Sequence, residues 1–290
     1  MNRIISTGRQ VINSSVFKRL GPLRAQLKKA FLTAASYTSA GAQVELGKGR
    51  EVIVPWDLVG ATDWSTYEPL SAEFFAGLID KTPDVLVVDI GCAIGIYSLL
   101  ALSVSARSEV CSMDSDLMGL AIAERMCMTA TTGRHRLLWG FCGDAEMARA
   151  NPKRHDFDEA CAASAEVLRK SGLKPRIGAN QYTCVGGANQ EHIPFWDMDS
   201  LLVPLAKTGR PILLKVDIEG AEIAMLRGSA ELSDYPNVQM LLSVHPHVLP
   251  RAWKSSKEEV QALVDSRGYR TTLIETTTEE HWWVRKERGG

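Results

Sequence analysis

The sequence has no acidic residue before Glu45, although acidic residues outnumber basic ones in the chain as a whole. Residues 1–44 carry seven Lys and Arg side chains, and the rest has 26 basic against 34 acidic residues, a formal charge of about −8. A domain that binds nucleic acid is expected to be basic. The acidic body therefore argues against a nucleic-acid partner.

The chain also lacks any CxxC pair, a signal-peptide apolar core and an uninterrupted membrane-length apolar run. The longest apolar run, Val85–Val104, is broken by Asp89, Gly91 and Gly95, which favours a strand, a turn and a helix over a membrane span. We expect reduced cysteines and a cytoplasmic protein without a transmembrane segment. The six scattered cysteines are Cys92, Cys111, Cys127, Cys142, Cys161 and Cys184.

Residues 1–42 form a basic arm in which apolar residues recur at helical spacing. Three interpretations stay open: a helix that packs on the domain, a helix in peripheral contact with a membrane surface, or a segment that directs organelle import. Residues 43–290 are predicted to form the main domain.

Strand and helix patterns alternate through this domain. Such alternation predicts an α/β fold: a mostly parallel, twisted sheet with helices on both faces, closed by an antiparallel C-terminal strand pair. A hairpin is expected around Gly47–Gly49, and residues 146–178 are predicted to be an inserted helical cap over the site. The strands are predicted at 85–90, 109–113, 136–142, 212–216, 238–244, 269–274 and 282–285, and the helices at 94–104, 117–130, 160–168, 221–227 and 257–267.

The first buried strand ends in a glycine turn, Asp89 to Gly95, before a helix. Ligands of open parallel sheets collect at the carboxyl ends of the strands, where Gly91 and Gly95 let the backbone approach them closely. We predict that this turn, with Cys92 and Ala93, holds the amino-acid end of S-adenosylmethionine (SAM), and that Asp89 binds its ammonium group directly or through water. A nicotinamide dinucleotide is the alternative, but it needs GxGxxG, which this turn lacks.

The next two strands also end in acidic residues. Asp114 comes about twenty residues after the glycine turn, where a carboxylate accepts hydrogen bonds from ribose hydroxyls. Ser115 lies beside it, and Asp116 is expected to cap the following helix. Asp144, after the third strand, is a candidate for the adenine amino group, and a solvated loop aspartate is the alternative.

The fourth strand leads into a second charged segment. Lys215, Asp217 and Glu219 fall on one side of an extended chain, where a methyl acceptor would lie. Buried charges are costly unless they are paired or used, which favours a functional role. Glu222 is expected only to favour the N-terminus of the next helix through its dipole.

The fifth strand ends in His245, Pro246 and His247. We predict His245 as the general base, with Asp217 or Glu219 behind it and Lys215 anchoring Asp217 or a substrate anion. No metal is firmly predicted, but Asp217, Glu219, His245 and His247 have the composition of a divalent-metal site.

Several segments resemble the FkbM family of methyltransferases. They are residues 67–69 with 87–98, the segment at 197–202, the block from Leu214 to Glu222 with 226–228, and 243–246. The resemblance implies a class I, Rossmann-like, SAM-dependent methyltransferase. It also implies that Glu68 belongs to the cofactor side. Cys92 and Asp114 stand where the family usually has alanine and glutamate, and the insertion at 146–178 is unusual.

The resemblance further implies O-methylation of a hydroxyl on a sugar or a polyketide-type small molecule, as in natural product biosynthesis. Three alternatives remain: an amine or carboxylate acceptor, a non-catalytic SAM-binding protein, and a nicotinamide-dependent oxidoreductase. Trp64, Tyr67 and Trp196 are candidates for an acceptor pocket or for the core. The sequence does not indicate an oligomeric state.

Overall fold

The computed structural model describes residues 41–47, 49–130, 134–143, 156–173 and 193–286. These ranges leave out the arm at residues 1–40, Asp144, Cys184 and the parts of the predicted cap at 146–155 and 174–178. Predictions about the arm are therefore not tested.

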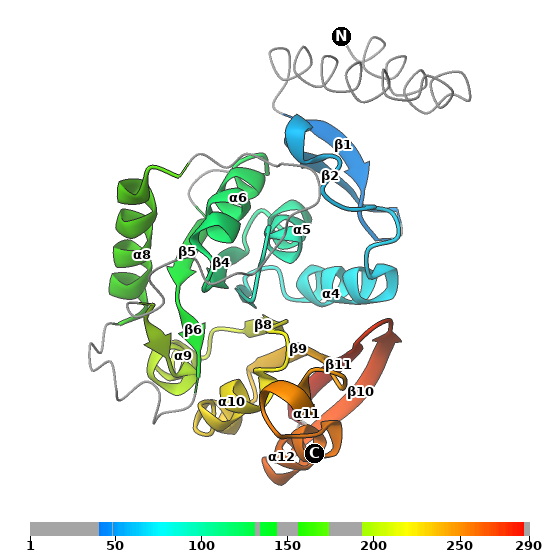
Figure 1. Cartoon of the computed structure of the whole chain (residues 1–290), viewed down its shortest axis with the longest axis vertical. Coiled ribbons are helices and arrows are strands. Elements are labelled where there is room, and N and C mark those ends of the chain that lie inside the picture. The colour runs from blue at the N-terminus through cyan, green and yellow to red at the C-terminus, as the bar shows by residue number, and fades with distance from the viewer. Residues whose placement is uncertain (1–40, 48, 131–133, 144–155, 174–192, 287–290) are drawn as a thin grey trace.

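A seven-stranded sheet crosses the molecule in the order β10-β11-β9-β8-β3-β4-β5 (Figure 1). The pairs β9–β8, β8–β3, β3–β4 and β4–β5 are parallel, whereas β11 is antiparallel to both β9 and β10. This is the predicted mostly parallel sheet with its antiparallel C-terminal pair. Its strands are β3 (Leu86–Ile90), β4 (Glu109–Asp114), β5 (His135–Trp139), β8 (Ile212–Val216), β9 (Val238–Val244), β10 (Tyr269–Thr276) and β11 (Glu280–Lys286).

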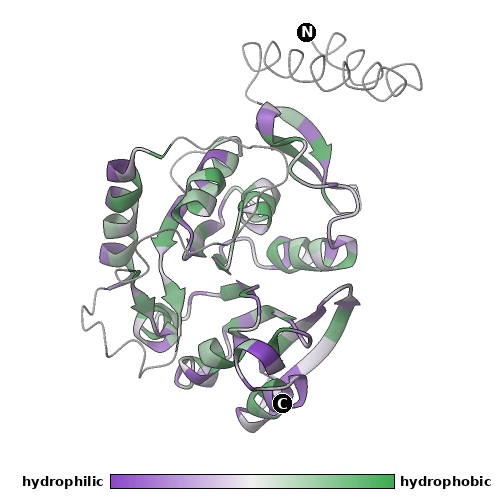
Figure 2. Ribbon diagram, viewed as in Figure 1, coloured by the Kyte–Doolittle hydropathy of each residue, from purple (hydrophilic) through white to green (hydrophobic). Residues whose placement is uncertain are grey.

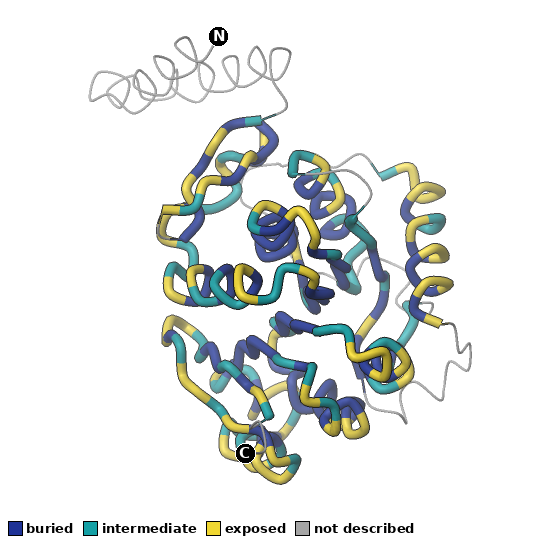
Figure 3. The backbone as a smooth tube through the Cα atoms, turned by 180° about the vertical axis from the view of Figure 1, so that it is seen from behind, coloured by how far each residue is buried: buried dark blue, intermediate teal, exposed yellow. Residues whose placement is uncertain are grey.

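Helices cover both faces of this sheet. The helices α4 (Pro69–Lys81), α5 (Ile96–Val104) and α6 (Leu117–Cys127) share one core with the face that carries Val87, Val110 and Leu213. The other face packs on α8 (Phe157–Ser171), α9 (Met198–Ala206), α10 (Glu222–Arg227) and α12 (Lys257–Ser266). The central strands β3, β8 and β9 are mostly apolar and buried (Figures 2 and 3), whereas the edge strand β10 is largely exposed or half-buried. The short elements are η1 (Trp56–Leu58), η3 (Leu232–Asp234) and α11 (Leu249–Ala252).

The predicted hairpin is confirmed: β1 (Ala42–Glu45) pairs antiparallel with β2 (Glu51–Val54). The third strand, predicted without a break at 136–142, is instead divided into β5 and the short β6 (Phe141–Cys142), which pairs with β7 (Phe195–Trp196). The break is Gly140, whose φ of 152° belongs to the region that favours glycine. A Cβ there would lie 2.4 Å from Trp196 Nε1.

The described part of the insertion is α8. Asp156 caps its N-terminus by accepting a hydrogen bond from Glu159 N, and Gly172 ends it with φ 63°. Phe157, Ala160 and Cys161 are buried against the sheet beside β5. This helix therefore covers the sheet, and a cap formed by residues 146–178 stays a prediction.

Five cysteines of the described residues are free and buried: Cys92, Cys111, Cys127, Cys142 and Cys161. Within the same part of the chain, no helix combines the length and the apolar character needed to span a membrane.

Candidate active site

The turn after β3 adopts a backbone that needs small residues. Gly91, Ala93 and Gly95 all have positive φ, at 77°, 48° and 78°. A Cβ on Gly91 would lie 1.8 Å from the carbonyl oxygen of Asp217, so only glycine fits against the end of β8. Cys92 is buried in the same turn. The turn is thereby held directly beside the predicted acceptor side.

Asp114 fixes the turn to the end of β4. Its Oδ2 accepts a hydrogen bond from Ala93 N at 2.8 Å, and its Oδ1 accepts one from Asp116 N at 2.8 Å. Burial raises the pKa of Asp114, while these backbone donors lower it. Asp116 caps α6 by accepting from Met118 N, as predicted. Ser115 follows Asp114 and is partly exposed, and its carbonyl accepts a hydrogen bond from Trp139 Nε1.

Asp89 points into the core. It is 2% exposed, and its Oδ2 accepts hydrogen bonds from both Ser98 N at 3.0 Å and Ser98 Oγ at 2.6 Å. Burial raises the pKa of Asp89 to about 6, against the lowering effect of Ser98. This oxygen of Asp89 is held by Ser98 of α5, and the contact of Asp89 with the SAM ammonium group stays a prediction.

Lys215 is completely buried at the end of β8, and its charge is balanced locally. Its Nζ lies 3.0 Å from Asp217 Oδ2, 2.8 Å from Ser243 Oγ and 4.7 Å from the centre of the Tyr97 ring. Burial favours the neutral amine, but Asp217, Glu68 and Asp89 outweigh it and raise the pKa of Lys215. The predicted pairing of Lys215 with Asp217 is present.

His245 stands at the centre of four carboxyl groups, with its side chain 1% exposed. Its Nδ1 lies 2.6 Å from Glu222 Oε1, and its Nε2 lies 2.7 Å from Glu279 Oε2, 3.5 Å from Asp217 Oδ1 and 3.7 Å from Glu219 Oε2. Burial lowers the pKa of His245, but Glu222, Glu279 and Asp217 outweigh burial and raise it to about 10.

Glu222 does more than favour a helix N-terminus. It is fully buried, and its Oε1 also accepts a hydrogen bond from Gly220 N at 3.0 Å. Our expectation that its role was limited to the helix dipole was therefore wrong. Glu222 is at the start of α10 because the loop from Asp217 folds sharply, with Glu219 at φ 51° and Gly220 at φ 99°.

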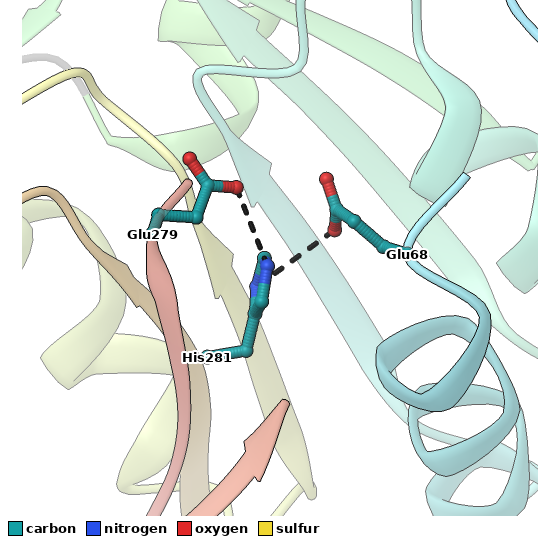
Figure 4. Close-up of side chains that lie close together, drawn as sticks. All are labelled: Glu68, Glu279 and His281. Atoms are coloured by element: carbon teal, nitrogen blue, oxygen red, sulfur yellow. Dashed lines mark ion pairs between the residues drawn. The ribbon is translucent and has the colours of Figure 1, made fainter. Parts of the chain in front are cut away.

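Two residues of the cluster were missed in the sequence, Glu279 and His281. They come from the connection between β10 and β11 and from β11 itself, and Figure 4 shows His281 with Glu279 on one side and Glu68 on the other. His281 Nε2 lies 3.3 Å from Glu279 Oε1, and its Nδ1 lies 2.9 Å from Ser243 Oγ. Nothing in the segment TTTEEH marks these residues. An acid and a histidine near a turn are common, and only the insertion of β11 beside β9 brings them to the site.

Glu68 precedes α4 with φ 39° and borders the same cluster. Its Oε2 accepts a hydrogen bond from Tyr97 Oη at 2.6 Å and lies 3.8 Å from His281 Nδ1. Burial raises the pKa of Glu68, while Lys215 and Tyr97 lower it. Glu68 therefore joins the N-terminus of α4 to both α5 and β11.

Some candidates lie apart from this cluster. His247 is exposed, and its ring centre is 6.2 Å from that of His245. Trp64 and Trp196 are buried core residues that donate hydrogen bonds to backbone carbonyls, whereas Tyr67 is partly exposed beside Tyr97. Asp144 lies outside the described residues.

The residues at the glycine turn fit SAM. Asp114 is partly exposed and is bound only through hydrogen bonds that leave lone pairs free for ribose hydroxyls. Gly91, which is partly exposed, and Ala93, which is exposed, lie beside it. Asp114, Ser115 and this turn would hold the cofactor, with Glu68 at the border to the acceptor side.

The chain was compared with known proteins. Residues 185–271 match the family model described as Methyltransferase FkbM domain. No curated protein sequence matches the chain significantly.

Solved structures similar to this chain include several methyltransferases. Methyltransferase FkbM from Methylobacillus flagellatus KT is 15% identical, with a TM-score of 0.43, over 70% of this chain and 44% of that chain. Precorrin-6y C5,15-methyltransferase from Geobacter metallireducens GS-15 is 7% identical, with a TM-score of 0.40, over 74% and 87%. The O-methyltransferase from Bacillus cereus in complex with SAH is 10% identical, with a TM-score of 0.39, over 74% and 79%.

The matched segment contains β8, the charged loop after it, α10 and β9, so it includes Lys215, Asp217, Glu219, Glu222 and His245. The resemblance seen in the sequence is confirmed there. Residues 185–271 therefore match the FkbM methyltransferase domain, the family that the sequence motifs resemble.

Proposed function

We propose that this protein transfers a methyl group from SAM to a hydroxyl of a small molecule of the sugar or polyketide type. The observation that carries the proposal is the contact between the two halves of the site. Asp217 N donates a hydrogen bond to Ile90 O at 2.9 Å, directly before the glycine turn. A ligand on that turn would therefore lie next to the carboxyl groups around His245.

When bound, SAM supplies a methyl group whose transfer to an acceptor oxygen breaks the sulfur–carbon bond. The protein must then align the acceptor and take up its hydroxyl proton. With a pKa raised to about 10, His245 holds a proton at neutral pH and is a poor general base. We had expected His245 in this role, and the carboxyl groups around it now support a different assignment.

Glu219 is the best-placed base. Its side chain is 73% exposed, whereas those of Asp217 and Glu279 are 20% and 13% exposed. Its backbone is held in a left-handed conformation beside Gly220, which fixes where the side chain begins. In this scheme Glu219 takes the proton, Asp217 and Lys215 hold the loop in place, and His245 positions the carboxylates.

The test is methyl transfer from labelled SAM by the full chain to a panel of sugar and polyketide alcohols, with amines, carboxylic acids and RNA as further acceptors. Glu219→Gln should lower kcat by about 10²–10⁴-fold while the Kd for SAM changes little. Glu124→Gln, at an exposed glutamate on α6, is the matched control.

Each of the other outcomes would indicate a different function for this protein. SAM binding without transfer to any acceptor would indicate a non-catalytic SAM-binding protein. Binding of a nicotinamide dinucleotide in place of SAM would indicate an oxidoreductase. Transfer only to amines or carboxylic acids would contradict the hydroxyl acceptor, and transfer only to RNA would contradict the small-molecule acceptor.

A further inference from the structure

We propose that Asp217, His245 and Glu279 form a binding site for a divalent cation of the Mn²⁺–Zn²⁺ class. One ligand atom from each residue lies within 4.8 Å of the other two. His245 Nε2 is 2.7 Å from Glu279 Oε2 and 3.5 Å from Asp217 Oδ1. Ligands held about 2.1 Å from one cation are separated by roughly 3 Å, so these atoms need little adjustment to share an ion.

The second observation is that His245 Nε2 lacks a well-aligned hydrogen bond, although Glu279 Oε2 lies 2.7 Å from it. This nitrogen is buried and has no hydrogen-bond partner of acceptable geometry among the described residues. Nδ1 is paired with Glu222 Oε1 at 2.6 Å. With one ring proton kept on Nδ1 toward Glu222, a cation that displaces the proton from Nε2 would take that proton's place between Nε2 and the carboxylate oxygens. A histidine held by a carboxylate through one nitrogen commonly binds metal through the other.

The local charge favours a divalent cation over a proton. Four carboxyl groups lie around one imidazole ring: Asp217, Glu219, Glu222 and Glu279. The Lys215 ammonium contacts Asp217 through Oδ2, which leaves Oδ1 directed toward His245. A proton on Nε2 adds one positive charge to this group, and a divalent cation adds two.

A second group of possible ligands, Glu68, Glu279 and His281, is a weaker candidate (Figure 4). Glu68 approaches His281 at Nδ1, whereas Glu279 approaches it at Nε2. A cation bound to either ring nitrogen would therefore lie nearer to one carboxylate than to the other. His281 Nδ1 and Glu68 Oε2 also already contact Ser243 and Tyr97.

The ligand types narrow the choice of metal. One imidazole favours Zn²⁺ or a neighbouring transition metal, and two carboxylates are also suited to Mn²⁺. Three protein ligands leave coordination positions open, as in catalytic metal sites. This role rests on the proposed function: an acceptor hydroxyl would fill such a position, and its pKa would fall before Glu219 takes the proton.

The experiment measures the cation alone, without SAM or acceptor. The full chain is stripped with a chelator and titrated with MnCl₂, followed by the electron paramagnetic resonance signal of free Mn²⁺, and with ZnCl₂ by calorimetry. We expect one saturable site per chain. Glu279→Gln and Asp217→Asn should each weaken binding at least tenfold, with circular dichroism confirming that the variants are folded.

Two variants serve as comparisons. His247→Gln changes an exposed histidine two residues from His245 and should leave the affinity unchanged. Glu68→Gln distinguishes the two groups of ligands, and loss of binding in this variant with normal binding in Asp217→Asn would overturn the assignment. Absence of saturable Mn²⁺ and Zn²⁺ binding by the unaltered chain would also overturn it.

SAM binding is measured on the same preparation, so that the two proposals fail separately. A chain that binds Mn²⁺ or Zn²⁺ but transfers no methyl group retains the cation site and contradicts the function. A chain that transfers methyl groups equally well before and after chelation, without binding either cation, contradicts the cation site alone.

Discussion

Ser98 donates both its backbone N–H and its hydroxyl to the same oxygen of Asp89, at 3.0 and 2.6 Å. The hydroxyl of Ser98 also lies 2.6 Å from Ser112 Oγ, which in turn lies 2.7 Å from His135 Nε2. A hydrogen-bonded chain therefore runs under the glycine turn, from β3 through α5 and β4 to β5. Its two ends are a carboxyl group and an imidazole.

Removal of the central hydroxyl should destabilise the protein. Ser98→Ala takes one donor from Asp89 and leaves the Ser112 hydroxyl with His135 as its remaining partner, which should lower the free energy of unfolding by about 1–3 kcal/mol. Ser103→Ala is the control, since Ser103 is exposed on the same helix and bonds only to the Leu99 carbonyl. Urea denaturation measures both variants, and equal losses would contradict a special role for Ser98.

The two ends of this chain should produce opposing pH effects. Burial lowers the pKa of His135 from 6.5 to about 4, so the unfolded chain binds more protons in this interval and stability rises with pH. Burial raises the pKa of Asp89 from 3.8 to about 6, so the folded chain binds more protons there and stability falls as pH rises.

Single variants separate the two contributions. The two pKa shifts span the interval from about pH 4 to pH 6.5. In His135→Gln, the slope of the free energy of unfolding against pH should become more negative over this interval. Asp89→Asn should have the opposite effect on the slope. The measurement is urea unfolding at several pH values and constant salt, and an unchanged slope in both variants would show that neither group titrates differently in the two states.

Gly91→Ala should reduce stability and SAM affinity by more than the positive φ of Gly91 alone explains. Gly91 and Gly209 have the same φ of 77°, but an added Cβ would be 1.8 Å from Asp217 O at Gly91 and would meet nothing within 4 Å at Gly209. Gly209→Ala should cost about 1 kcal/mol of stability with unchanged SAM affinity. Gly91→Ala should lose more stability and weaken SAM binding at least tenfold, as measured by thermal unfolding and calorimetry.

Lys215→Met should strongly destabilise the fold. The variant keeps a similar side-chain volume but leaves Asp217 without the Lys215 ammonium group. Loss of one partner of a buried ion pair costs roughly 3–5 kcal/mol. Adding Asp217→Asn to Lys215→Met should restore part of the loss, which denaturant unfolding can measure. Lys207→Met, at an exposed lysine that contacts Glu231, should have no measurable effect. An equal loss of stability in Lys207→Met and Lys215→Met would contradict the role of Lys215 in balancing the charge of Asp217.

The sheet and the glycine turn could be predicted from the sequence because both depend on local patterns. Buried strands followed by helices define the parallel order, Gly91 directly follows β3, and Asp114 is the last residue of β4. The surroundings of His245 could not be predicted in the same way. Glu279 and His281 reach it only because β11 pairs with β9 and leaves β10 outside, a pairing that no single segment encodes.

Glu222 and His247 show a second limit on predicting the positions of site residues from the sequence. Both lie near predicted site residues, yet Glu222 is fully buried against His245 while His247 is exposed. A two-residue period applies only while the chain remains extended. β8 ends at Val216 and β9 at Val244, so the positions of the following side chains depend on turns that the period does not describe.

The place of β11 has a consequence for how the protein is made. Because β11 follows β10 in the sequence but lies between β10 and β9 in the sheet, β9 exposes an unpaired edge until β11 has been synthesised. The glycine turn and its sheet can assemble earlier, from segments already synthesised. Glu279 arrives only with the closing strand, so a chain cut short before it would possess a place for the methyl donor and lack the finished acceptor side.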